Sequence, residues 1–316
     1  MKFALGVAVL ALALVGAGTC AAQREREPAP EPHRGSSVPG IGVYNGSPDK
    51  SPDETTMRDF CQAPDVTNSY YQHNSNLNLA YETARIKRGT SPNISISTNG
   101  TQLLAGVARR NPAAIAWLDG WIAKLAKLAA VNRTVPVYAT LDQEFKVRIR
   151  RGTLTGESAD PKVYGKALDI FFKRANAAHP NIETSYWFVG YDRQVEGEVG
   201  TMFTRNPDAI LFDPYANVGS DTVTTITRAD MTWIKSQPWY DGQTVGLAEF
   251  GMPVGLGDAA MANFYKSVPN HLKNMGIDWA VLFNRMRDND HQITHRSDRK
   301  VFPRAVASFR DSAQMQ

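Results

Sequence analysis

The sequence has 316 residues, of which 42% are hydrophobic, and its formal net charge is +4. This is the composition of an ordinary globular protein with enough apolar residues for a sizeable core. Lysine and arginine are scattered, and their densest cluster is Arg148, Arg150 and Arg151. The sequence therefore lacks the basic stripe that is typical of a nucleic-acid-binding protein.

Residues 1–22 are typical of a secretory signal peptide, because Lys2 precedes an apolar run and small residues follow up to Ala22. The run is too short for a finished transmembrane helix, so we expect cleavage, secretion and no stable membrane span. Cys20 leaves a less favoured alternative, a cell-envelope lipoprotein. Cleavage would leave Cys61 as a lone buried thiol. Residues 23–37 are charged and proline-rich, which predicts a linker.

Residues 38–316 have the length of one α/β barrel domain. Eight short apolar runs are flanked by Gly, Pro, Asn or Asp, the residues that punctuate strands. The predicted strands are 40–44, 66–71, 93–97, 135–140, 183–189, 209–212, 245–248 and 279–283.

Amphipathic helices are predicted between several of these strands. Asn111 with Pro112, and Asp160 with Pro161, are typical helix starts, and each precedes a single apolar stripe. A third helix begins near Asp258 and is expected to bend or end at Pro269. Strand–helix units without an internal repeat favour a closed (β/α)8 TIM barrel in a single domain over a doubly wound sheet.

Two glutamates close short apolar runs at matching places in this pattern. Glu144 follows the fourth predicted strand and Glu249 follows the seventh. The carboxyl ends of barrel strands surround one mouth, where two carboxylates can act as general acid and nucleophile on a glycosidic bond. A single strand-end glutamate would more often face solvent, but the pair favours catalysis.

In their order these motifs resemble glycoside hydrolase family 26, a family of retaining (β/α)8 glycosidases that includes β-mannanases. The run Ala248-Glu249-Phe250-Gly251 is similar to the family's Ser-Glu-Phe-Gly around the nucleophile. Asp213-Pro214-Tyr215 is similar to a strand-six motif whose tyrosine contacts the nucleophile. The resemblance spans about residues 38–310 and implies Glu144 as acid/base and Glu249 as nucleophile.

The sequence departs from the family next to these glutamates. Gln143 occupies the position of a usual histidine, and the mannanase aromatic cluster after the acid/base is missing. Phe283-Asn284 occupies the place of a tryptophan-like platform. The substrate within the β-glycans therefore stays open. The candidate substrate-binding residues are Gln143, Asp213, Tyr215, Trp187, Phe283 and Asn284.

The sequence thus predicts a secreted retaining glycosidase, endo-β-mannanase-like, that cleaves β-mannan or another β-glycan by double displacement. We expect a monomer that binds polysaccharide or oligosaccharide and no nucleic acid, and that needs no cofactor and no metal. The motifs at 255–260 and 288–291 are weak nucleotide and metal signals, and a solvated loop is the favoured interpretation of the second. The alternatives are a non-catalytic glycan-binding barrel on the same scaffold and, less favoured, a barrel enzyme of other chemistry.

Overall fold

The computed structural model describes residues 38–46, 59–190, 193–266, 268–285, 290–294 and 302–314. The predicted signal peptide and linker lie outside these residues. Within the described residues, no helix combines the length and apolarity needed to cross a membrane. Cys61 is half-buried, which is less than the full burial expected of it.

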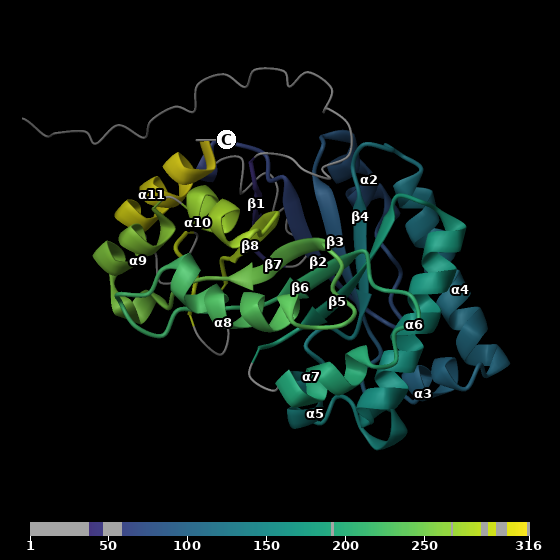
Figure 1. The fold of residues 1–316 in the computed structure, drawn as a ribbon. Coiled ribbons are helices and arrows are strands. Elements are labelled where there is room, and N and C mark those ends of the chain that lie inside the picture. Colours follow the sequence, from purple (N-terminus) through teal and green to yellow (C-terminus); the bar gives the residue numbers. More distant parts are fainter. Residues whose placement is uncertain are drawn as a thin grey trace, which may run out of the picture.

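Eight parallel strands form a nearly closed barrel with helices around it, which confirms the predicted single-domain (β/α)8 fold (Figure 1). The strand bounds are within a residue or two of those predicted. The strands are β1 Gly40–Tyr44, β2 Val66–Gln72, β3 Ser91–Ser97, β4 Val137–Leu141, β5 Ile182–Phe188, β6 Ala209–Phe212, β7 Thr244–Phe250 and β8 Trp279–Phe283.

The helices follow the strands in the expected alternation. They are α2 Leu79–Lys87, α3 Leu103–Ala108, α4 Pro112–Ala129, α5 Phe145–Arg150, α6 Pro161–Ala178, α7 Arg193–Gly200, α8 Val223–Lys235, α9 Asp258–Tyr265, α10 Val268–Met275 and α11 Pro303–Gln314, with short 3-10 turns at Gly156–Ala159 and Val254–Leu256. Asn111 and Asp160 cap α4 and α6 as predicted, since each side chain accepts hydrogen bonds from backbone N–H groups of its own first helical turn.

The third predicted helix is two helices, α9 and α10. Pro269 lies in the first turn of α10 and does not end a helix. A proline is tolerated there because the first N–H groups of a helix have no intrahelical acceptor.

The barrel closes at a seam between β1 and β2. The hydrogen-bonded ladder runs from β1 through β8 and back along the barrel to β2. The two end strands are joined by isolated bonds: Asp65 N–H donates to Ile41 O at 2.9 Å, Ile41 N–H donates to the Asp65 carboxylate at 3.0 Å, and Thr67 Oγ1 donates to Val43 O at 3.1 Å. Gly42 is required here, because a Cβ would lie 1.8 Å from the Val66 carbonyl oxygen.

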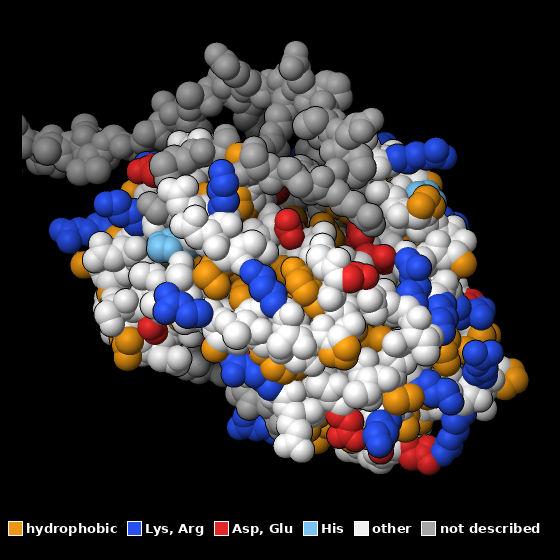
Figure 2. All heavy atoms as spheres, viewed as in Figure 1, with side chains coloured by type: hydrophobic (Ala, Val, Ile, Leu, Met, Phe, Trp, Pro, Cys, Tyr) orange, Lys and Arg blue, Asp and Glu red, His pale blue; other side chains and the backbone are white. Residues whose placement is uncertain are grey.

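The barrel interior contains both apolar and polar buried side chains. Trp187, Leu211 and Val281 belong to an apolar cluster inside the barrel. From β2 and β3, Asn68, Asn93 and Ser95 are fully or almost fully buried. On the outer surface, Lys and Arg side chains are spread across the visible face and are interspersed with Asp and Glu (Figure 2).

Candidate active site

Glu249 lies near the carboxyl end of β7 and is half-buried. Its two carboxylate oxygens each accept a hydrogen bond from a phenol: Tyr70 donates to Oε1 and Tyr215 donates to Oε2, both at 2.5 Å. The predicted contact between Tyr215 and Glu249 is thereby confirmed. Burial and the charge of Glu249 raise the pKa of both tyrosines, so both phenols keep the proton that they donate.

Asp213 follows β6 and fixes the backbone of Glu249. One of its oxygens accepts from the N–H of Glu249 at 2.9 Å, and the other accepts from the indole N–H of Trp187 at 2.7 Å. Burial, followed by the charges of Glu249 and Glu144, raises the pKa of Asp213. Trp187 is fully buried, so its ring has no face on which a sugar can stack. In this structure Asp213 holds the backbone of Glu249, and Trp187 holds Asp213.

Glu144 lies in a turn beyond the end of β4, which stops at Leu141. Glu144 is the N-cap residue of α5 and has φ 56°, and Asp142 has φ 43°. Left-handed backbone is costly for residues other than glycine, so the surroundings must hold this turn. The N–H of Glu144 donates to Trp187 O at 3.0 Å, and the side chain is half-buried.

Arg148 lies in the first helical turn of α5, and its guanidinium contacts the loop that carries Glu144. Its Nε donates to Gln143 O at 2.8 Å, and its terminal nitrogens donate to Gln143 Oε1 at 2.5 Å, Ser97 Oγ at 2.7 Å and Asn99 Oδ1 at 3.1 Å. A terminal nitrogen also lies 3.5 Å from the buried carboxylate of Asp142. The planar guanidinium therefore ties the end of β3 to the turn that carries Glu144.

The two glutamates act on the same groups. The charge of Glu144 contributes, after burial and Glu249, to the raised pKa values of Asp213 and Tyr215. Both of those residues are hydrogen-bonded to Glu249. Hydrogen bonds connect the two positions: the N–H of Glu144 donates to Trp187 O, the indole N–H of Trp187 donates to Asp213, and Asp213 accepts from the N–H of Glu249. Glu144 and Glu249 therefore lie at the same end of the barrel although they come from different strands.

The other residues that the sequence predicts to bind substrate are Phe283, Asn284 and Gln143, and all three are buried. Phe283 is buried, and its ring centroid lies 6.3 Å from that of Tyr215. Asn284 is buried, and its side chain joins the loops after β1 and β8, with bonds to Asn45 at 2.6 Å, Thr294 at 2.8 Å and the N–H of Ile293 at 2.8 Å. Gln143 Oε1 accepts from Ser95 and Arg148, and its Nε2 has no acceptor among the described residues.

Two residues near the phenols on Glu249 are absent from the candidates that the sequence offers. Tyr70 is the first, and its hydroxyl donates to Glu249 Oε1. The second is His291, which was expected in a solvated loop but is buried, with its ring centroid 4.5 Å from that of Tyr215. Within the described residues there is no cluster of three potential metal ligands.

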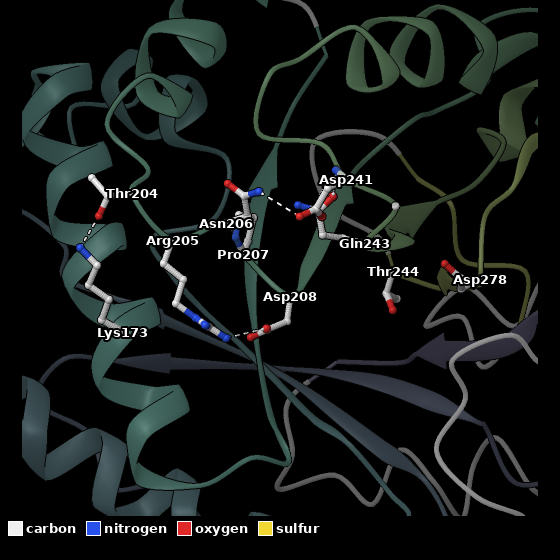
Figure 3. A pocket seen from close by; sticks show the side chains of 11 residues that line it. Lys173, Thr204, Arg205, Asn206, Pro207, Asp208, Asp241, Gln243, Thr244 and Asp278 are labelled. Atoms are coloured by element: carbon white, nitrogen blue, oxygen red, sulfur yellow. Dashed lines mark hydrogen bonds and ion pairs between the residues drawn. The ribbon is translucent and has the colours of Figure 1, made fainter.

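A pocket of about 920 Å³ lies at the opposite end of the barrel (Figure 3). Asp208, Thr244 and Asp278 line it at the amino-terminal ends of β6, β7 and β8. Other lining side chains bond to one another, as in Arg205 with Asp208 at 3.3 Å and Asn206 with Asp241 at 3.2 Å. This pocket is therefore separate from the mouth that holds Glu249.

Solved structures resemble this chain, although no protein-family model and no curated protein sequence matches it. A family 26 endo-β-1,4-mannanase from Cellulomonas fimi has a TM-score of 0.58 at 14% identity, over 87% of this chain and 70% of that chain. A β-mannanase from a symbiotic protist of the termite Reticulitermes speratus has a TM-score of 0.54 at 13% identity, over 88% and 90%. The family 26 domain of a Prevotella bryantii mannanase/glucanase has a TM-score of 0.55 at 11% identity, over 88% and 92%. The chain thus has the fold of family 26 mannanases.

Proposed function

We propose that this protein is a retaining glycoside hydrolase that cleaves a β-linked polysaccharide by double displacement. One observation carries the proposal: the carboxylate of Glu249 is held by two phenols, at 2.5 Å each, at the end of the barrel where Glu144 also lies. A strand-end glutamate without a function would not need both oxygens bound by buried donors. The fold shared with mannanases supports the same conclusion.

In the first step the ionised Glu249 attacks the anomeric carbon, and Glu144 gives its proton to the departing glycosidic oxygen. The second step reverses these roles, because Glu144 now takes a proton from water while the water oxygen displaces Glu249 from the sugar. The phenols stabilise the charge on Glu249 at the start and at the end of the cycle. The charge of Glu249 disfavours a second charge nearby, which keeps the proton on Glu144.

β-Mannan is the proposed substrate, since the structural neighbours include endo-β-mannanases. Secretion is part of the proposal because residues 1–22 have the features of a signal peptide. N-terminal sequencing of the protein released by its host would give the cleavage site, and recovery of the uncut chain in the cytoplasm would contradict export.

The experiment is a reducing-sugar assay on mannan, glucomannan, mixed-linkage glucan and xylan. We expect release from at least one β-glycan, and proton NMR of the first product should show the anomeric configuration of the substrate. Glu249→Gln is the control, because an amide cannot form the glycosyl-enzyme. Binding to a glycan without release by the parent would favour the alternative of a glycan-binding barrel, and an inverted first product would contradict double displacement.

A further inference from the structure

A chain of buried amides connects β3 to the second phenol on Glu249. Asn93 Nδ2 donates to Asn68 Oδ1 at 2.8 Å, and Asn68 Nδ2 donates to the hydroxyl oxygen of Tyr70 at 3.1 Å. Tyr70 in turn donates to Glu249 Oε1. Both asparagines are at most 1% exposed, so water cannot replace these bonds without a cost.

The direction of every link is fixed by one backbone carbonyl. Asn68 Nδ2 also lies 2.6 Å from Ala248 O, which can only accept a hydrogen bond. The atom of Asn68 that faces Ala248 must therefore be the nitrogen, and the same nitrogen faces Tyr70. Since an amide nitrogen only donates, the hydroxyl oxygen of Tyr70 accepts, and its one proton is left for Glu249.

The packing around Tyr70 keeps its ring in place. The ring centroid of Tyr70 lies 5.0 Å from that of Tyr44 and 5.8 Å from that of Trp187. Tyr71, the next residue, faces the outside of the barrel, where its hydroxyl donates to Glu82 Oε1 at 2.8 Å. Two adjacent tyrosines therefore make the same kind of bond on opposite sides of β2, and Tyr70 is the one that reaches the mouth.

We propose that Tyr70, oriented by Asn68 and Asn93, is a positioning residue that acts as an obligate second hydrogen-bond donor to the nucleophile. This inference rests on the proposed function of Glu249 and goes beyond it, because the family resemblance assigns this contact to Tyr215 alone. The bond favours the carboxylate over the carboxylic acid. It also favours deglycosylation, the step in which Glu249 regains its charge, over glycosylation, the step in which it loses that charge.

The test is Tyr70→Phe, with Tyr71→Phe as the matched control, on 2,4-dinitrophenyl β-mannobioside. A hydrogen bond to a charged group corresponds to about one pH unit or more, so the acidic limb of kcat/KM should move up by about one pH unit in Tyr70→Phe. Below that limb kcat/KM should fall about tenfold. Slower deglycosylation should also give a larger pre-steady-state burst of dinitrophenol. Tyr71→Phe should keep the parent's limb and burst, since its hydroxyl does not contact Glu249.

A second measurement does not need turnover. In a double-mutant cycle, Tyr70→Phe should lower the melting temperature more in the parent than in Glu249→Gln, because the lost bond is to the carboxylate. The inference would be overturned if the effects of the two substitutions on the melting temperature were additive. It would also be overturned if Tyr70→Phe were active with an unmoved acidic limb of kcat/KM. In either case Glu249→Gln could still abolish activity, so the proposed function would stand. If the parent cleaves no glycoside, the proposed function fails, and the cycle alone decides whether Tyr70 holds the Glu249 carboxylate.

Discussion

Replacement of Arg148 by Met should destabilise the protein, chiefly through the buried carboxylate of Asp142. Asp142 is fully buried, whereas the side chain of Arg148 is 12% exposed, and the two groups are 3.5 Å apart. Removing one partner of a buried ion pair costs about 3–5 kcal/mol. Asp142 keeps its bonds from the N–H of Thr98, at 2.9 Å, and from the Thr98 hydroxyl, at 2.5 Å, so the lower end of about 3 kcal/mol is expected.

The loss should depend on pH, and its sign follows from Asp142. Burial raises the pKa of this carboxyl, and the charge of Arg148 opposes that rise. A raised pKa in the folded state means that stability falls as the pH increases through that pKa. Because the rise is larger without Arg148, the variant should lose more stability at pH 8 than at pH 5, where Asp142 can take up a proton.

Differential scanning calorimetry at both pH values is the assay. A loss of about 3 kcal/mol corresponds to about 5 °C, because a domain of about 280 residues has an unfolding entropy of about 0.6 kcal/mol/K. Arg151→Met is the control, because Arg151 closes the same helix and is exposed, and it should melt close to the parent. The reasoning is refuted if Arg148→Met also melts within a degree or two of the parent, or if its loss is the same at pH 5 and pH 8.

Other substitutions test the site and the barrel. Glu249→Gln should fold and lose nearly all hydrolysis, and near-parental turnover by a folded sample would end the assignment. Glu144→Ala should still be glycosylated by a dinitrophenyl glycoside, and azide should restore turnover because it attacks without a base; no response to azide would count against Glu144 as acid/base. Trp187→Phe should cost about 2 kcal/mol in a denaturant titration, since a buried oxygen of Asp213 loses its donor; an unchanged midpoint would argue against that bond. Gly42→Ala should lower the yield of folded protein far more than Gly40→Ala, whose Cβ meets its nearest atom at 3.2 Å, and equal yields would contradict the close approach at the seam.

Much of the fold could be predicted from the sequence because buried parallel strands are short apolar runs between turn residues. The bounds of β1, β6 and β8 are those expected. The turn at Glu144 could not be predicted, because its left-handed backbone depends on contacts distant in the chain, such as the bond from the N–H of Glu144 to Trp187 O. The sequence places Glu144 after the fourth strand but does not indicate the backbone conformation there.

Parts of the candidate site could be predicted from short sequence motifs. Asp213 and Tyr215 belong to one such motif, and Glu249 belongs to another. Tyr70 was missed because alternate residues of a strand face opposite sides, and the sequence does not say which of two adjacent tyrosines faces inward. Its partner Asn68 gave no signal, since a buried asparagine looks like a turn residue until the strand that it faces is known. The hydrogen bonds of Asn284 could not be predicted for the same reason, because they are to loops that the sequence leaves unplaced.

The seam between β1 and β2 also determines where the barrel can open at least cost. Seven neighbouring pairs share a hydrogen-bonded ladder, which has one register shift between β7 and β8. The β1–β2 pair is joined instead by isolated bonds that partly use the side chains of Asp65 and Thr67. Local openings follow the weakest cooperative contacts of a fold. Amide protons along this edge should therefore exchange with deuterium sooner than those between β6 and β7. Since Tyr70 is carried by β2, an opening of the seam would release one of the two phenols from Glu249 before the rest of the barrel unfolds.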